Sequence, residues 1–301
     1  MVNITHKSST LRKAIAMAVV KVGDISTINA VLENTVPKGN VMEMAKAAGF
    51  FAIKKTSEII PDCHPLPIEY AHVSYQIEGL EIKIKVEVQT IYKTGVEVEA
   101  MHGASVVALT IYDMLKPIDK NITIEKISLL EKTGGKSDYK NQDLNSISAS
   151  IIVYSDEVYN KIKDDNAGKA TFEYLQSLGL KTIQYQILPN NKQELEAIIK
   201  AQLLNQTKLI LIVGGTGVGT KDDAPEIVSS FLDKELPGVM ESARGYGQAR
   251  TPHAMLSRGV AGVSGGALLI TLPGSTKGAK ETMQSLFPSL FHVFKTLENN
   301  L

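Results

Sequence analysis

The clearest hydrophobic pattern of the chain is a strict alternation between residues 71 and 90. The runs AHVSYQI (71–77) and LEIKIKVEVQT (80–90) place an apolar residue at every second position. That period is typical of strands with one buried face, and the intervening Glu78 and Gly79 suit a tight turn. The sequence therefore predicts a β-hairpin.

Apolar residues recur three and four positions apart on both sides of the hairpin. The segments NVMEMAKAAGFFAIKKTSEII (40–60) and EVEAMHGASVVALTIYDMLK (97–116) fit amphipathic helices, and each is followed at once by a proline. The segment LRKAIAMAVV (11–20) has helical composition, and Lys21 ends its apolar run with no small-residue cleavage site after it. We therefore expect a helix there rather than an export signal. A further strand is predicted at ITIEKISLL (122–130), and this order of elements favours an α+β fold.

The pattern changes in the middle of the chain. Residues 138–147 are polar and lack apolar periodicity, which is typical of a linker. Beyond them, helical segments separate four short apolar runs: ASIIVYS (149–155), TIQYQIL (182–188), LILIVGG (209–215) and ALLITLPG (267–274). Such runs are buried on both faces of a parallel sheet. We expect two domains, residues 1–142 with an α+β fold and residues 143–301 with an α/β fold on a mostly parallel sheet.

Composition narrows the class of protein. The 301 residues carry 32 basic and 32 acidic side chains and no long basic run, which argues against nucleic acid or a membrane surface as a partner. No apolar stretch approaches the roughly 20 residues that span a bilayer. The single cysteine excludes an internal disulfide and a multi-thiolate metal site, and a cytoplasmic location fits.

Several polar residues of the first domain could carry chemistry. His64 lies between Cys63 and a proline, so a rigid backbone aims its ring, although such a histidine is often only structural. Cys63 has no evident base to activate it, and a small buried side chain is the simpler interpretation. Asp113 and Lys116 share one helix face and would form at least a surface ion pair. Lys38, at a helix entry, could meet a phosphate or could be a solvated loop lysine.

Three segments of this domain resemble the cyclic pyranopterin monophosphate synthase family: residues 37–66, 93–116 and 129–137. The resemblance covers nearly all of residues 1–138 and implies a ferredoxin-like α+β subunit, a hexamer built from dimers and an active site between subunits. It implies conversion of a cyclised dihydro-GTP into cyclic pyranopterin monophosphate with release of pyrophosphate, and no cofactor. Carried over position by position, the site residues are Lys38, Lys54, His64, Glu97, Glu99, Asp113, Lys116 and Lys136.

The chemistry of this set fits the implied reaction. Lysines would neutralise the triphosphate and its leaving group, and Lys116 beside Asp113 would move protons. His64 can exchange protons near neutral pH. We expect Lys38, His64, Asp113 and Lys116 to be catalytic and the others to bind substrate, with the two glutamates at positions 97 and 99 on different helix faces. One departure is Asn40 in place of the family's aspartate, so any orientation of Lys38 by charge should be weaker.

The second domain contains the segment LILIVGGTGVGTKDDAPE (209–226), a strand, glycine-rich turn and helix that can present backbone N–H groups to an anion. It is not a Walker A loop, because Thr220 stands where that motif has lysine, and it is a poor dinucleotide fingerprint. Glycines that serve only a tight turn would give the same pattern. Asp222 and Asp223 beside a phosphate suggest an intervening Mg²⁺, whereas Asp223 could also cap the next helix.

This segment, with residues 153–175, 236–244 and 271–283, resembles molybdopterin adenylyltransferase and related molybdopterin-binding domains across residues 147–301. The resemblance implies a doubly wound three-layer α/β domain, often trimeric, that transfers AMP from Mg-ATP to molybdopterin. Asn190 departs from the pattern, because active members carry an aspartate there, and metal affinity should fall. The matching positions are Asp165, Gly214, Gly215, Thr216, Gly217, Asp222, Glu241, Pro273, Gly274 and Ser275, with Asp222 as the Mg²⁺ ligand.

The two resemblances together predict a bifunctional enzyme of molybdenum cofactor biosynthesis. Its small-molecule partners would be the cyclised dihydro-GTP, molybdopterin and ATP. The alternative is a second domain that only binds a pterin or fixes the assembly, which Asn190 favours and Asp222 opposes. A homo-hexamer with both two-fold and three-fold axes would suit both domains.

Overall fold

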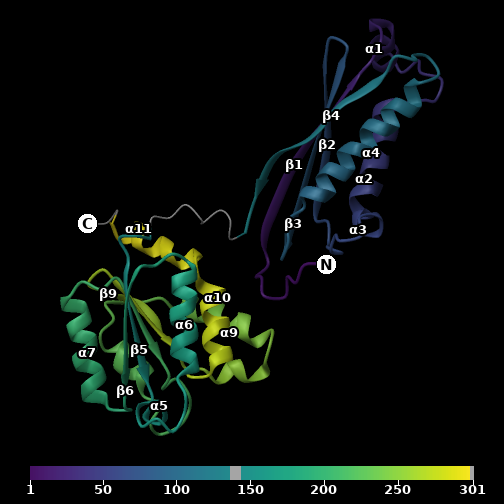
Figure 1. Cartoon of the computed structure of the whole chain (residues 1–301). Coiled ribbons are helices and arrows are strands. Elements are labelled where there is room, and N and C mark those ends of the chain that lie inside the picture. The colour runs from purple at the N-terminus through teal and green to yellow at the C-terminus, as the bar shows by residue number, and fades with distance from the viewer. Residues whose placement is uncertain (136–143, 299–301) are drawn as a thin grey trace. The chain divides into compact units, whose positions relative to one another are not determined.

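The structure is a computed structural model, and it describes residues 1–135 and 144–298. The chain divides into two units, Met1–Asp138 and Tyr139–Leu301. The predicted linker and the expected boundary at residues 142 and 143 fall largely outside the described residues. Figure 1 labels many of the helices and strands of both units.

The first unit is built on a four-stranded antiparallel sheet in the order β2-β3-β1-β4. The predicted hairpin is confirmed as β2 and β3, which close with Glu78 opposite Glu81. The unit has the expected α+β fold, and its sheet and helices are consistent with a ferredoxin-like subunit. Its elements are β1 (Thr10–Lys21), α1 (Ile25–Leu32), α2 (Val41–Lys54), α3 (Thr56–Ile59), β2 (Tyr70–Glu78), β3 (Glu81–Tyr92), α4 (Glu97–Leu115) and β4 (Thr123–Thr133).

The helix predicted for residues 11–20 is wrong, because this segment is strand β1. β1 pairs with β3 on one side and β4 on the other. Ala14, Ala16 and Ala18 on one face have no exposed surface, and Ile15 and Val19 on the other face are also buried. A strand that is apolar on both faces shows no alternation, so its alanines give the composition of a helix.

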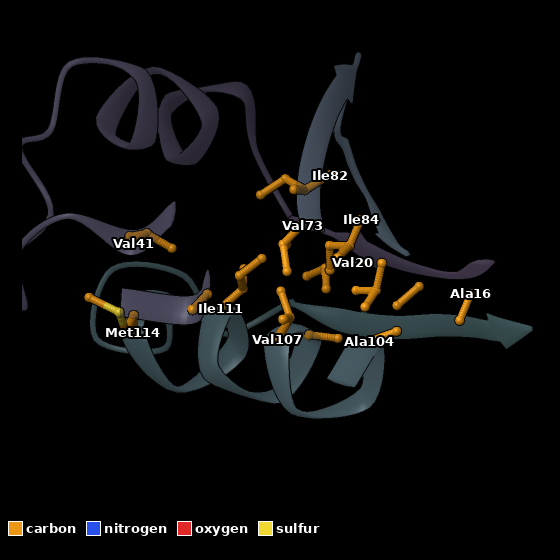
Figure 2. Packing of buried hydrophobic residues seen from close by; sticks show 14 of the residues in the cluster. Ala16, Val20, Val41, Val73, Ile82, Ile84, Ala104, Val107, Ile111 and Met114 are labelled. Carbon is orange, nitrogen blue, oxygen red and sulfur yellow. The ribbon is translucent and has the colours of Figure 1, made fainter. Parts of the chain in front are cut away.

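The helices α2 and α4 pack closely against each other. Figure 2 shows side chains of α4, such as Val107 and Ile111, among buried residues of the strands. A Cβ atom on Gly49 would lie 2.4 Å from Cγ2 of Val107, and one on Gly103 would lie 2.6 Å from Cγ1 of Ile53. These two glycines permit the approach, and their pairing shows that the two helices run antiparallel. Residues that precede α2 are therefore carried toward the end of α4.

The second unit is built on a six-stranded sheet in the order β6-β5-β7-β10-β9-β8. Strands β6, β5, β7 and β10 are parallel neighbours, and β9 pairs antiparallel with both β10 and β8. The mostly parallel sheet expected from the sequence is confirmed. The strands are β5 (Ser148–Tyr154), β6 (Thr182–Leu188), β7 (Leu209–Val213), β8 (Lys234–Glu235), β9 (Ala261–Ser264) and β10 (Ala267–Leu272).

Helices cover both faces of this sheet, which gives three layers. One core includes Ile151 and Leu211 and the other includes Ile152 and Ile212, so successive residues of one strand point into opposite cores. No helix in the described parts of the chain is both long and apolar enough to cross a bilayer. The helical elements are α5 (Asp156–Tyr159), α6 (Asn166–Ser177), α7 (Lys192–Leu204), α8 (Ala224–Ser229), α9 (Pro237–Gln248), η2 (Pro252–Leu256), α10 (Thr276–Leu286), η3 (Ser289–Phe291) and α11 (His292–Glu298).

Candidate active site

Three of the predicted catalytic residues meet at the end of α4. Asp113 accepts hydrogen bonds from Lys38 Nζ and Lys116 Nζ, both at 2.7 Å, and Lys38 Nζ also donates to the Asp113 carbonyl oxygen at 2.8 Å. We call these three residues the lysine–aspartate cluster. The hydrogen bonds from Lys116 and Lys38 lower the pKa of Asp113 to about 2. One carboxylate thus holds two half-exposed ammonium groups, which suits the binding of a more highly charged anion.

Asn40 has a structural role in this region. Its side chain caps α2 by accepting a hydrogen bond from the Glu43 amide at 3.0 Å. Lys38 is instead held by Asp113, so the orientation that an aspartate at position 40 could supply comes here from α4.

The start of α4 holds a second group, which we call the glutamate group: Cys63, His64, Glu97 and Glu99. The two glutamates point to different sides, as predicted. Glu97 pairs with Lys132 of β4 at 3.0 Å, whereas Glu99 is only 2% exposed and accepts a hydrogen bond from Cys63 Sγ at 3.1 Å. His64, which follows Cys63 in the chain, is half-buried.

The pKa values of the two glutamates are shifted in opposite directions. Burial acts to raise the pKa of Glu97, but a backbone hydrogen bond, Lys132 and Arg12 together hold it below its ordinary value. Burial raises the pKa of Glu99, and Cys63 and His102 offset only part of that effect. Burial and Glu99 in turn raise the pKa of Cys63 to about 12, so the thiol stays protonated. Of the two carboxyls in this group, Glu99 is therefore the one whose surroundings favour the protonated form.

The lysine–aspartate cluster and the glutamate group do not meet within one chain. Glu99 and Asp113 are fourteen residues apart on α4, which corresponds to about 21 Å along the helix axis. Groups that act on one reacting centre must lie within hydrogen-bond reach of it. Lys54 is exposed at the end of α2, near the glutamate end of α4, and Lys136 lies outside the described residues.

The second unit has a cleft of about 640 Å³ at the carboxyl ends of its parallel strands. It brings together many of the predicted positions: Asp165, Gly214, Gly215, Asp222, Gly274 and Ser275. Gly214 and Gly215 have φ of 109° and 62°, and a Cβ on Gly214 would lie 2.4 Å from the Tyr154 carbonyl oxygen. These two glycines are therefore required by the turn itself, whatever ligand it holds.

Three acidic residues in or next to the cleft accept hydrogen bonds from groups of the protein. Asp165 caps α6 through the Gly168 amide and accepts from the Tyr185 hydroxyl, and burial raises its pKa. Asp223 does not cap α8 through its side chain, contrary to one expectation, but accepts from the Tyr154 hydroxyl at 2.9 Å. Asp222 accepts from the Gly219 amide through Oδ2, at 2.8 Å.

Asn190 ties three loops together. Its Oδ1 accepts from the Asp156 amide at 2.6 Å, and its Nδ2 donates to the Lys221 carbonyl oxygen at 3.2 Å. Lys221 Nζ in turn binds Asp156 Oδ2 at 2.6 Å. An aspartate at position 190 could not donate to the Lys221 carbonyl, so the carboxamide has a use here beyond metal binding.

Some predicted positions lie elsewhere. Glu241 is exposed on α9 and does not line the cleft, and Thr216 is buried in the glycine loop. Gly217 contacts Asp222, and Pro273 lines a neighbouring cavity of about 400 Å³ that shares Ser275 with the cleft. Within residues 1–135 and 144–298, no group of three or more His, Cys, Asp and Glu side chains could hold a metal ion. Mg²⁺ usually binds through one or two carboxylates plus substrate phosphates, so Asp222 fits an ion that arrives with a nucleotide.

Several residues that line the cleft or hold its glycine loop were not predicted from the sequence. Tyr154, Asp156 and Lys221 line the cleft, and Arg258 donates to the Gly217 carbonyl oxygen at 2.7 Å. Each is bound to a residue far along the chain. The position of Asp156 directly after a buried strand was the one available signal, because strand ends meet at one edge of a parallel sheet.

Comparison with known proteins agrees with this division. Residues 1–135 match the model of the MoaC family, and residues 150–292 match a model described as "Probable molybdopterin binding domain". A molybdenum cofactor biosynthesis bifunctional protein of Chlorobaculum tepidum is 37% identical over 301 residues, covering 100% of this chain and 95% of that protein. The cyclic pyranopterin monophosphate synthase of Listeria monocytogenes serotype 4a is 48% identical over 138 residues, or 46% of this chain and 86% of that protein. The crystal structure of the molybdopterin biosynthesis enzyme MoaB from Thermus thermophilus covers 51% of this chain and 97% of its own, with 33% identity and a TM-score of 0.48.

The fold and the two sites thus define a two-domain enzyme that joins a MoaC-family domain to a molybdopterin-binding type of α/β domain. The fusion predicted from the motifs is confirmed. The chain belongs to the family of molybdenum cofactor biosynthesis bifunctional proteins, because the similarity to such a protein extends over its whole length.

Proposed function

We propose that the N-terminal domain, residues 1–142, converts a cyclised dihydro-GTP into cyclic pyranopterin monophosphate and pyrophosphate without a cofactor. The lysine–aspartate cluster carries this proposal. Two ammonium groups held by one carboxylate form a ready site for a triphosphate, and binding of the phosphate oxygens would release Asp113 from part of its ion pairing. The MoaC-family match over residues 1–135 supports the assignment.

Lys116 and Lys38 would stabilise charge on the phosphate groups, and Asp113 would hold both lysines in place until substrate arrives. His64 and Glu99 would exchange protons with the ring system that is rearranged. Glu97, held ionised by Lys132, would bind substrate rather than transfer a proton. Lys54 and Lys136 would add positive charge around the anionic substrate.

The active site would be shared between two copies of the chain. The cluster and the glutamate group lie about 21 Å apart along one helix, and a second copy can bring its glutamate group to the first copy's cluster. This arrangement requires a homo-oligomer, and we propose a hexamer with both two-fold and three-fold axes in the cytoplasm.

Turnover of the cyclised dihydro-GTP by the intact chain tests the proposal directly. Lys116→Ala should lower kcat by at least about a hundredfold, because it removes a group that meets charge in the transition state. Lys120→Ala, an exposed lysine four positions further on, is the matched control and should leave kcat unchanged. Equal activity of the Lys116→Ala variant and the control would contradict the role of the cluster.

For the C-terminal domain, residues 143–301, we propose transfer of AMP from Mg-ATP to molybdopterin. The cleft supports this through its glycine loop and the start of α10, where backbone N–H groups can meet phosphates. Ser275 lines both the cleft and the neighbouring cavity, so a phosphate at this residue could be approached from both sides. Mg²⁺ would be held by Asp222 together with ATP phosphates, where it would neutralise charge on the leaving pyrophosphate.

The rival proposal for this domain is a pterin-binding or assembly module without catalysis. Asn190 favours it, because its carboxamide is used between loops and brings no charge to a metal. Calorimetric titration with ATP, with and without Mg²⁺, separates the two. A catalytic domain should bind ATP with Mg²⁺ and lose this binding in Asp222→Asn but not in Glu173→Gln, a change at an exposed side chain of α6. Pterin binding without any binding of ATP would establish the module.

A further inference from the structure

Glu99 is a buried carboxyl with one oxygen occupied and the other open. Its Oε1 accepts the thiol of Cys63, the chain's single cysteine, at 3.1 Å. Its Oε2 is buried and has no hydrogen-bond partner within the described part of the chain. A buried polar atom without a partner is costly in folded proteins, so this oxygen is available to a group from outside the chain.

Groups around Glu99 act in opposite directions on the protonation of its carboxyl. The titratable groups that act electrostatically on Glu99 are Cys63, from the loop between α3 and β2, and Glu97 and His102, from α4 itself. Burial and Glu97 favour the neutral acid, whereas Cys63 and His102 favour the anion. His102 is in turn held by Thr56 Oγ1, 3.1 Å from its Nδ1.

We propose that Cys63 is a positioning residue for the N-terminal reaction: its S–H group occupies Oε1 of Glu99, so that the acid proton resides on Oε2 and faces a nitrogen or oxygen of a purine-derived ring. The proposal rests on the proposed function of this domain and adds to it a direction for one proton. In the transfer, the O–H bond at Oε2 breaks and the proton goes to the ring heteroatom. The carboxylate that remains is held by the S–H group, and Cys63 keeps its own proton throughout because its pKa is about 12.

A thiol that merely fills space makes different predictions from one that donates. Ser keeps a donor at position 63 in a smaller side chain, and Ala keeps the small size without a donor. A packing role would be weakened by both substitutions and at every pH. A donating role would be lost only in Cys63→Ala and would change the titration of Glu99.

The test is the pH dependence of kcat/KM in the unmodified chain, Cys63→Ser and Cys63→Ala. Because the thiol stabilises the ionised form of Glu99, its removal should raise the pKa of that carboxyl and move the corresponding limb of the profile upward by about one pH unit. Cys63→Ser should keep the limb near its original position. An Ala profile that is lower at all pH values but unshifted, or Ser and Ala variants that behave alike, would overturn the proposal.

A second readout does not depend on turnover. Since the chain has one cysteine, its S–H infrared band comes from Cys63 alone. The band should shift as Glu99 titrates, and this pH dependence should vanish in Glu99→Gln. A band that is the same in both proteins at all pH values would refute the hydrogen bond. Absence of turnover in the unmodified chain would refute the proposed function, and the infrared result would then decide the hydrogen bond by itself.

Discussion

Two inactive variants of this chain should restore activity to each other. Lys116→Ala removes the lysine–aspartate cluster's function and Glu99→Gln removes the acid of the glutamate group, and each should be inactive alone. The two positions lie at opposite ends of α4, seventeen residues or about 26 Å apart along the helix axis, so one chain cannot supply both to one substrate. If sites form between copies, a mixed pair contains one site with both changes and one site with neither.

The expected recovery follows from counting. Random pairing of equal amounts yields mixed pairs in half of the cases, and half of the sites in each mixed pair are intact, so about one quarter of the original activity should return. The assay is turnover of the cyclised dihydro-GTP by chains co-expressed with two different affinity tags and purified through both. In a hexamer this purification removes only assemblies made of a single variant, so about one quarter remains the expected recovery. Doubly tagged protein with no more activity than either variant alone would show that each site is built within one chain.

Three further predictions concern stability. Gly103→Ala should lower the free energy of unfolding of the N-terminal domain by about 1–2 kcal/mol in urea titrations, because its Cβ would meet Ile53. The control is Gly245→Ala in α9, where a Cβ meets open space, and it should be neutral or slightly stabilising. The pKa of Asp113 is lowered from 3.8 to about 2, so its ion pairs contribute stability above its unfolded pKa and lose it as the pH falls toward 2. The thermal unfolding midpoint should therefore fall less steeply between pH 4 and pH 2 in Asp113→Asn than in the unmodified chain. An unchanged slope would speak against these ion pairs. Asn190→Asp should cost about 1 kcal/mol by calorimetry, since it loses the bond to the Lys221 carbonyl and faces Asp156, while Asn191→Asp should be nearly neutral because it still caps α7. Equal stability of these two variants would contradict a bridging role for Asn190.

The elements with a regular period could be predicted from the sequence, and those shaped by burial on two sides could not. The hairpin of β2 and β3 and the helices α2 and α4 follow directly from their periodicity. β1 was missed because its neighbours in the sheet, and not its own pattern, decide its conformation.

The site residues show the same limit. Asp113 and Lys116 are three positions apart, and their contact was predictable from helix geometry. The bond from Cys63 to Glu99 and the bonds from Asn190 to Asp156 and Lys221 join loops and elements that are distant in sequence. Nothing local in the chain specifies such pairs, since they depend on how the helices and strand ends are brought together.

The helix α4 also fixes the distance between Glu99 and Asp113 and the rotation about the helix axis that separates them. With about 3.6 residues per turn, one residue inserted between Glu99 and Asp113 would turn one end by about 100° relative to the other and lengthen the helix by about 1.5 Å. Four inserted residues would nearly restore the phase but would separate the two ends by a further 6 Å or so. In an assembly where each α4 serves two sites, residues between these ends can therefore be exchanged far more freely than a residue can be added or removed.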